Sequence, residues 1–529
     1  MIRQRELIKG GVAGIGALAL GPAFWEGAMA ASARPGPGPY GPLGPADANG
    51  LRLPPGFSSR LIAQGEVPVP GTAYVWHGAS DGSATYALGD GGWILVSNSE
   101  IPGDVGGRGL GGASAIRFRA DGSITDAYRI LEGTRFNCSG GKTPWNTWLS
   151  CEEVDTGRVW ECDIFGKNPA LARPAMGVFS HEAAAVDEDG RRVYMTEDVS
   201  DGAFYRFTPD RWPDLSAGVL ELARVAPSGE VEWLRVPDPS AATMPTRKQL
   251  PGYTVFRRGE GLYFDRDAAT VYVAESSADR VHAYNTPTET IDVVFERKAI
   301  EGESPLADTD NVTVGHSGDV FVCEDGGDLR IGVITPEGEV ATFMQLDPNM
   351  HAASESTGPS FDPSGRRFYI SSQRFAVAGA VFEISGPFRT ARPADTRPPA
   401  LRVDAGPTVS RPVLRKRGLR VAVTTGEPGT ATVALRVPRA GRPPLTLARR
   451  EIPTDGRQAA SFSLRPGRKG RRRLKARRSK LDATLIVVAR DRAGNRRLAT
   501  RAVVVGRPSP QTPPAGAPLG RRSGKFAAG

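Results

Sequence analysis

The chain has 529 residues, of which 64 are glycine and 44 are proline, so these two turn-forming residues make up about a fifth of it. Such a content argues against a mostly helical fold. Hydrophobic residues at 40% and charged residues at 24% are ordinary for globular proteins, which argues against both a disordered chain and a membrane bundle. The composition therefore predicts an all-β protein with one large domain and a smaller second part.

The net charge of +9 is the sum of two opposite parts. Residues 396–529 contain 32 Lys and Arg against 6 Asp and Glu, a net charge of +26. Residues 1–395 contain the remaining 35 basic and 52 acidic residues, a net charge of −17. This asymmetry predicts two domains with different surfaces, an acidic one suited to metal ions and a basic one suited to polyanions.

Residues 1–30 have the pattern of an export signal. Basic residues precede a weakly apolar run over residues 10–24, and Ala28-Met29-Ala30 offers a cleavage site. The run is too short to span a bilayer, and no other stretch approaches the required length, so no transmembrane segment is expected after signal removal. The spacing from Arg5 to Lys9 resembles the twin-arginine motif, although Gln4 stands where the first arginine belongs. A Sec signal is the alternative, and either route predicts a periplasmic, cell-envelope or extracellular protein.

The chain contains four cysteines, Cys138, Cys151, Cys162 and Cys323. This number is far too small for a fold built on disulfides. One or two disulfides are compatible with an oxidising compartment, and the sequence does not choose among the pairings.

A repeat runs through the acidic part of the chain. Each unit has a polar turn, an alternating apolar strand and then an acidic or polar residue, and the steps between five of these strands are 45, 78, 49 and 48 residues. Three of the four steps match the length of a propeller blade. The strands end in Leu149–Glu152, Tyr194–Glu197, Tyr272–Glu275, Phe321–Glu324 and Tyr369–Ser372. With an earlier strand over 93–98, the repeat predicts a six-bladed β-propeller for residues 45–390.

The repeated glutamate at the end of these strands is expected to line the central channel. Because side chains alternate along a strand, Cys151 and Cys323 should face the opposite way from Glu152 and Glu324, into the packing between blades. Several carboxylates in a narrow channel repel one another unless they are neutralised. The pattern therefore predicts bound cations.

One block carries a specific resemblance. Residues 137–153 read NCSGGKTPWNTWLSCEE and are similar to the NCAGG-TPWGTW-L-CEE block of PhoX-type alkaline phosphatases. Similar blocks follow in the same order, and the resemblance covers about residues 50–390. The blocks are Ser180–Ala184, Thr196–Asp198, Arg258–Gly261, Asp310–Asn311, Cys323–Gly326 and Glu355–Pro359. One departure is Asn146, which stands where the family has glycine; if that position needs a positive φ, asparagine is the most tolerable substitute.

The resemblance implies a six-bladed propeller that holds Fe(3+) and Ca(2+) in the channel mouth and hydrolyses small phosphomonoesters with a metal-bound hydroxide or oxide. It implies that Cys138, which lies in a Gly-rich loop, is a thiolate ligand, and thiolate suits iron better than calcium. It implies that Arg258 is the catalytic cation that binds the substrate phosphate. The carboxylates implied as metal ligands are Glu152 or Glu153, Glu182, Glu197 and its neighbour Asp198, Glu260, Asp310, Glu324 and Asp325.

Two alternatives stay open. A noncatalytic exported propeller could bind metal or polymer structurally, and a calcium-dependent propeller similar to lactonases could hydrolyse another ester, although such an enzyme does not need the cysteine. A zinc site of several histidines is not expected, because the chain has five histidines and Ala185 stands where a zincin motif starting at His181 needs its second histidine.

The composition changes after Phe388. Residues 391–399 read as a Pro-rich linker, and alternating segments in residues 400–507 predict a small basic β-sandwich similar to immunoglobulin or fibronectin modules. Its lack of Trp and Tyr argues against specific nucleic-acid binding. Its charge could bind an anionic envelope polymer, with a merely solvated surface as the alternative. The tail over 508–529 is expected to be disordered, and the protein is expected to be a monomer.

Overall fold

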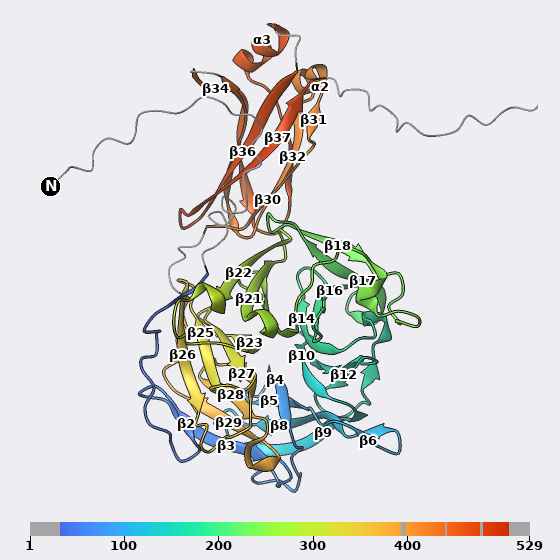
Figure 1. Ribbon diagram of the computed structural model, residues 1–529, viewed down its shortest axis with the longest axis vertical. Helices are drawn as coiled ribbons and strands as arrows, with labels where there is room; N and C mark the ends of the chain where they lie inside the picture. The colour runs from blue at the N-terminus through green and yellow to red at the C-terminus, as the bar shows by residue number, and fades with distance from the viewer. Residues whose placement is uncertain (1–31, 393–397, 440–441, 477–479, 507–529) are drawn as a thin grey trace, which may run out of the picture. The chain divides into compact units, whose positions relative to one another are not determined.

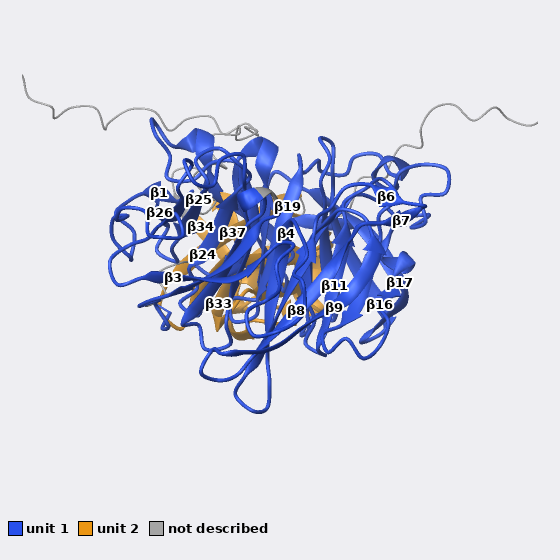
Figure 2. Ribbon diagram, turned by 90° about the horizontal axis from the view of Figure 1, so that it is seen from below, with its two compact units in different colours: residues 1–400 blue, residues 401–529 orange. Residues whose placement is uncertain are grey.

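The structure is a computed structural model that describes residues 32–392, 398–439, 442–476 and 480–506. The predicted export signal and the predicted tail lie outside the described residues, as does the middle of the predicted linker. The chain divides into two compact units, residues 1–400 and residues 401–529, which Figure 2 distinguishes by colour. Strands dominate both units, so the predicted all-β class is confirmed.

Unit 1 contains six main sheets of four to six strands, mostly antiparallel (Figure 1). The first three sheets in chain order are formed by β4 (Ser80–Ala87), β5 (Trp93–Ser99), β8 (Gly111–Phe118) and β9 (Ile124–Thr134); by β10 (Asn137–Lys142), β11 (Thr147–Glu152), β12 (Val159–Asp163) and β13 (Leu171–Ala172); and by β14 (His181–Asp187), β15 (Arg192–Glu197), β16 (Phe204–Arg211), β17 (Asp214–Val225) and β18 (Val231–Arg235). A small separate hairpin, β6 (Asp104–Val105) and β7 (Arg108–Gly109), is inserted between β5 and β8.

The other three sheets complete the unit. They are formed by β19 (Gly259–Asp265), β20 (Thr270–Glu275), β21 (Arg280–Asn285) and β22 (Thr290–Glu296); by β23 (Thr309–Val314), β24 (Val320–Glu324), β25 (Arg330–Ile334) and β26 (Glu339–Leu346), with the short β1 (Arg34–Pro35) and β2 (Leu51–Arg52) on β26; and by β27 (Ser356–Phe361), β28 (Arg367–Ser372), β29 (Ala380–Ser385) and β3 (Ser58–Gln64). Single 3-10 turns are η1 (Pro174–Met176), η2 (Thr246–Gln249), η3 (Ser276–Ala278), η4 (Arg297–Ala299) and η5 (Phe375–Val377). The last sheet joins the two ends of the unit, because β3 pairs antiparallel with β29.

The segments of the sequence repeat occupy equivalent places. Each of them lies in the second strand of its sheet, which is β5, β11, β15, β20, β24 or β28. The first strand of each sheet contacts the first strand of the next sheet, in the order β4, β10, β14, β19, β23 and β27, and β27 contacts β4. The six first strands therefore form a closed cycle of contacts around one centre.

Apolar side chains fill the spaces between neighbouring sheets. Leu149 and Cys151 of β11 pack in one cluster with Val193 and Met195 of β15 in the next sheet. Cys323 packs in another buried cluster with the side chains of β28 and β29. The two cysteines therefore belong to the packing between sheets, as their alternation with Glu152 and Glu324 predicts.

Unit 2 consists of two sheets and two helices. One sheet contains β30 (Leu401–Ala405), β32 (Leu419–Thr425) and β35 (Ala460–Leu464), and the other contains β31 (Thr408–Val409), β37 (Arg496–Val505), β36 (Leu481–Asp491), β33 (Pro428–Arg439) and β34 (Arg442–Asp455). The helices are α2 (Arg411–Lys416) and α3 (Arg468–Ala476). Val403 and Val421 of the first sheet share one buried cluster with Val433 and Leu485 of the second.

Candidate metal centre

A β-bulge recurs in the first strand of all six sheets of unit 1. In each case the pairing with the second strand shifts so that three steps on the first strand match two on its partner, as between Asn137 opposite Glu152 and Gly140 opposite Ser150. The same shift occurs in the other five sheets. A bulge turns a side chain out of the regular alternation. The residues that follow the first ladder pair at these bulges are Asp81, Cys138, Glu182, Glu260, Asp310 and Thr357.

A second set of equivalent residues comes directly after the second strands. Its members are Glu100, Glu153, Asp198, Ser276, Asp325 and Gln373. Because the second strand of each sheet ends opposite the start of the first strand, both sets lie at the same end of the sheets. We call the two sets together the acidic ring; nine of its twelve members are carboxylates or a thiol.

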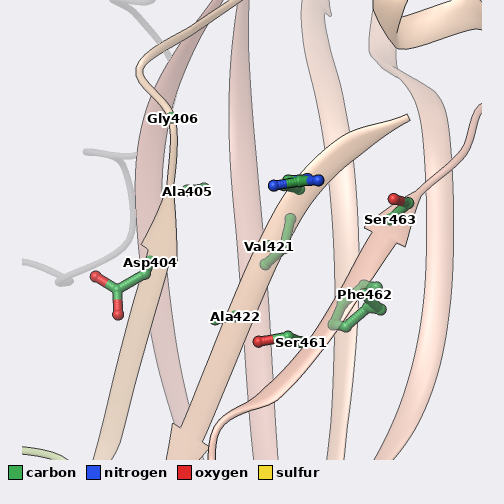
Figure 3. A pocket seen from close by; sticks show the side chains of 9 residues that line it. Asp404, Ala405, Gly406, Val421, Ala422, Ser461, Phe462 and Ser463 are labelled. Atoms are coloured by element: carbon green, nitrogen blue, oxygen red, sulfur yellow. The ribbon is translucent and has the colours of Figure 1, made fainter. Parts of the chain in front are cut away.

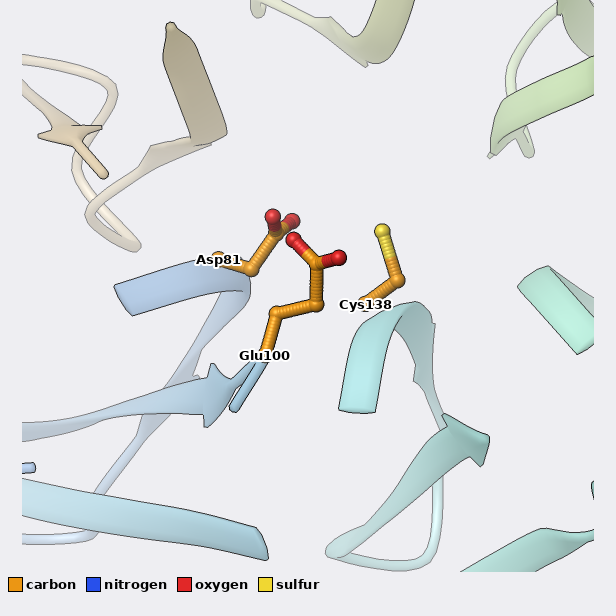
Figure 4. Close-up of side chains that lie close together, drawn as sticks. All are labelled: Asp81, Glu100 and Cys138. Carbon is orange, nitrogen blue, oxygen red and sulfur yellow. The ribbon is translucent and has the colours of Figure 1, made fainter. Parts of the chain in front are cut away.

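Ligand atoms of the acidic ring come close enough to share cations. Three groups each have their ligand atoms within 4.8 Å of one another: Asp81 with Glu100 and Cys138; Cys138 with Glu153 and Glu182; and Glu182 with Glu260 and Asp310. Figure 4 shows the first group, in which the side chains of Asp81, Glu100 and Cys138 point toward one another. Cys138 and Glu182 each belong to two groups, so the three groups form one connected site.

Glu182 occupies the centre of this site. Its side chain is fully buried, and neither carboxylate oxygen has a hydrogen-bond partner among the described residues. Burial, followed by the charges of Glu260 and Glu153, raises the pKa of Glu182 well above its usual value. A buried carboxylate without a hydrogen bond is very unfavourable unless a proton or a cation neutralises it. The donor set around Glu182 therefore fits a bound metal ion.

The pKa values of Asp81, Glu260 and Glu153 in the acidic ring are raised as well. Burial is the largest cause in each case, and neighbouring carboxylates add to it. The pKa is raised to about 8 for Asp81, to about 8 for Glu260 and to about 10 for Glu153. Burial also raises the pKa values of the Asp310 carboxyl and the Cys138 thiol well above normal. The protein alone therefore favours neutral forms here, whereas bound cations favour the deprotonated ligands.

Three acidic residues of the site were not predicted from the sequence. Asp81 and Glu100 are bridged by the side-chain amide of Gln373, which donates to both carboxylates. Glu355 precedes β27 and forms an ion pair with Arg374 at 3.0 Å. Burial raises the pKa of Glu355 to about 9. If the six repeat units are aligned by their first strands instead of their second strands, Asp81 and Cys138 occupy equivalent positions.

Arg258 lies beside the ring and is held by carboxylates. Its Nε and Nη2 donate to the two oxygens of Asp198 at 2.8 and 2.9 Å. Nη2 also lies 3.3 Å from Glu260, and Nη1 lies 3.6 Å from Asp325. The Arg258 side chain is 40% exposed, and the residue adopts a φ of +54°, which is unusual for a residue other than glycine. The bidentate pair fixes one edge of the guanidinium and leaves Nη1 with only the longer contact to Asp325.

Glu152 and Glu197 do not join the acidic ring, because their carboxylates bind their own sheets. Glu152 accepts from the indole Nε1 of Trp160 at 2.9 Å in the next strand. Glu197 accepts from Tyr205 at 2.8 Å and from Arg247 at 2.6 Å. These glutamates connect the second strand of a sheet to the third strand, and Glu197 also to Arg247 in η2.

Glu324 and Glu275 act in the same way. Glu324 accepts from the backbone N–H groups of Ala307 at 2.8 Å and of Arg330 at 2.9 Å. Glu275 accepts from His282 at 2.8 Å. These terminal glutamates therefore lie outside the three groups of close ligand atoms, whose members are residues that follow the second strands and bulge residues of the first strands. That the terminal glutamates line a central channel stays a prediction.

The remaining sequence expectations concern the cysteines and Asn146. All four cysteines lie in the described part of the chain and are free thiols, three buried and Cys138 partly exposed. Asn146 adopts a φ of +62°, the conformation in which asparagine replaces glycine most readily.

A separate hollow of about 630 Å³ lies in unit 2 (Figure 3). It is lined by Asp404, Ala405, Gly406, Arg420, Val421, Ala422, Ser461, Phe462 and Ser463. With one acidic and one basic side chain it offers no group of metal ligands, so the candidate centre is the acidic ring of unit 1. Among the described residues, no helix has the length and apolar character needed to cross a membrane.

Comparisons with solved structures give distant similarities. A protein of unknown function from Bacteroides thetaiotaomicron has 10% identity and a TM-score of 0.39, over 65% of this chain and 83% of that one. A calcium-binding protein, regucalcin, from Agrobacterium tumefaciens has 14% identity and a TM-score of 0.33, over 64% and 98%. A putative 6-phosphogluconolactonase from Bacteroides uniformis has 12% identity and a TM-score of 0.33, over 78% and 97%.

A search of curated proteins found no match. A family model described as alkaline phosphatase PhoX matches residues 107–170, 166–292 and 284–375. These segments cover half of the chain and contain every member of the acidic ring from Cys138 to Gln373. The chain therefore belongs to the PhoX alkaline phosphatase family.

Proposed function

We propose that this chain is an exported, metal-dependent phosphomonoesterase whose active site is the acidic ring. The observation that carries the proposal is Glu182, a buried carboxylate without a hydrogen-bond partner among the described residues, in a chain of an alkaline phosphatase family. The export signal predicted for residues 1–30 supports a place outside the cytoplasm.

The donor chemistry of the ring suits both iron and calcium. Cys138 offers a thiolate beside Glu153 and Glu182, which is a suitable environment for Fe(3+). Glu182, Glu260 and Asp310 offer only carboxylate oxygens, which Ca(2+) prefers. When bound, such cations would neutralise the ring and polarise a phosphoryl oxygen.

Arg258 supplies the cation that this chain itself brings to the substrate. Its contacts with Asp198 orient the guanidinium of a partly exposed side chain, and Nη1, whose contact with Asp325 is longer, is the group that we assign to a phosphate oxygen. A guanidinium fixed in advance stabilises charge that develops in a transition state. Arg374 carries a second partly exposed guanidinium beside Glu355.

We also propose the finer fold assignments. Six sheets whose first strands form a closed cycle of contacts support a six-bladed β-propeller in unit 1. Two sheets with a common buried cluster support a β-sandwich in unit 2.

Metal analysis and one matched pair of variants test the proposed function. The purified protein should contain iron together with calcium and should hydrolyse 4-nitrophenyl phosphate. Glu182→Gln should lose metal and activity, because it removes the charge at the centre of the ring. Glu152→Gln is the control: its carboxylate lies one residue before Glu153 but binds Trp160, so metal content should stay. A protein that holds calcium alone and has no phosphatase activity would favour the noncatalytic or lactonase-like alternative.

A further inference from the structure

The helix α3 in unit 2 presents an unusual concentration of positive charge. Six of its nine residues are Arg or Lys, and all six side chains are exposed. These residues are Arg468, Lys469, Arg471, Arg472, Arg473 and Lys475. The helix contacts α2, and Figure 1 shows both at one end of unit 2. The end of α2 adds exposed cations at Lys416 and Arg417.

Packing fixes the orientation of α3. Leu474 is buried in the core of unit 2, and Gly470, four residues earlier, is also buried. A Cβ atom at Gly470 would come within 2.1 Å of the backbone oxygen of Leu447 in β34, so the helix lies directly against this strand. Since residues four apart share one face of a helix, the anchored face is apolar and the cations point outward.

The charges on α3 have no counterions among the described residues. None of its six cations forms an ion pair with another side chain in the described part of the chain. The whole of residues 396–529 contains only six acidic residues to offset 32 basic ones. Cations three and four residues apart, such as Arg468 with Arg472 or Arg471 with Lys475, repel each other and destabilise the helix. A bound polyanion would remove this repulsion.

We propose that α3, with the adjoining end of α2, is the binding surface for a linear polyanion rich in phosphate and lacking bases. One guanidinium group can donate two parallel hydrogen bonds to a phosphate group, and the helix carries four arginines. Base stacking needs exposed aromatic rings, yet the aromatic ring of unit 2 in the described ranges is Phe462, which is partly buried and covered by Arg450. The surface is therefore expected to recognise the negative charge of its ligand and not its bases.

The test uses the full chain and labelled inorganic polyphosphate as the probe. The variant Arg471→Gln/Arg472→Gln/Arg473→Gln removes three cations from α3. The matched control Arg436→Gln/Arg490→Gln/Arg492→Gln removes three exposed cations, two from β33 and β36 and one from the turn that follows β36. Binding is measured at several salt concentrations, and circular dichroism records the fold and the melting temperature of each protein.

We expect the α3 variant to bind polyphosphate at least tenfold more weakly at 0.1 M salt, with the salt slope reduced by about two, since each cation contributes about 0.7 to it. The control should lose less than threefold. Without polyphosphate, the α3 variant should melt at the same or a higher temperature, because like charges are removed. Equal losses in both variants would overturn the proposal, as would tighter binding of a single-stranded DNA of equal charge.

Discussion

Removal of the metal ions should reverse the usual pH dependence of stability in this protein. In the acidic ring, burial and neighbouring carboxylates raise the pKa of Glu260 to about 8 and that of Asp81 to about 8. An unfolded chain ionises the same groups near pH 4, so between these values the folded form binds more protons than the unfolded form. Folding stability must then fall as the pH rises.

The magnitude follows from the proton linkage. A carboxyl that keeps its proton in the folded state and loses it on unfolding changes the free energy of unfolding by about 1.4 kcal/mol per pH unit. Between pH 5 and pH 7 this gives about 3 kcal/mol for Glu260 alone. The ring carboxyls share protons with their neighbours, so we expect the loss to be at least that of one group. Bound cations remove the effect, because they stabilise the ionised ligands.

The assay compares protein treated with a chelator and protein supplied with iron and calcium. Denaturant unfolding, followed by circular dichroism at pH 5, 6, 7 and 8, gives the free energy of unfolding of each form. The metal-free form should lose stability across this range, and the loaded form should not. A metal-free form whose stability is flat or rises toward pH 8 would refute the reasoning, because the ring carboxyls would then ionise without penalty.

Three further outcomes are expected. Cys138→Ser should remove iron and its visible absorbance while calcium stays, measured by elemental analysis; full iron content would exclude the thiolate. Arg258→Ala should lower kcat/KM about 100- to 1000-fold, as expected for one preorganised donor, with Arg258→Lys in between. Arg257→Ala, an exposed neighbour, is its control, and equal losses would mean that position 258 is structural. Glu197→Gln should lower the melting temperature without a change in metal content, because its carboxylate binds Arg247. A loss of metal in this variant would mean that Glu197 is a metal ligand.

The sequence predicted the strands better than it predicted the positions of the site residues. Regular alternation places the residue before Glu152 in the core, and Cys151 is indeed buried. The same alternation does not identify the close ligand atoms, which exclude Glu152 and come from bulge residues and from residues after the second strands. An extra residue in a strand leaves no signal in the apolar pattern. Cys138 and Glu182 were predicted as site residues by family resemblance, which compares sequence blocks and does not depend on strand geometry.

Asp81 and Glu100 show a second limit. The second strand of their sheet ends with Ser99, whereas four of the other five sheets have glutamate at this position, so the acidic residue of the repeat is missing there. Asp81 and Glu100 lie at one end of neighbouring strands of one sheet, and Gln373 of the last sheet bridges them. The basic surface of α3 was predictable from composition as an excess of charge, but its orientation depends on the contact of Gly470 with β34.

The pairing of β3 with β29 sets an order of events during synthesis. Residues 58–64 leave the ribosome early, yet their partner, residues 380–385, is made more than three hundred residues later. Until then β3 has an open edge, and Asp81 and Glu100 lack Gln373, which also comes from the late segment. The candidate metal centre therefore becomes complete only when nearly all of unit 1 exists, so a nascent or prematurely ended chain would hold a partial set of its acidic residues. Transport of an already folded protein, as in the twin-arginine route, suits such an assembly.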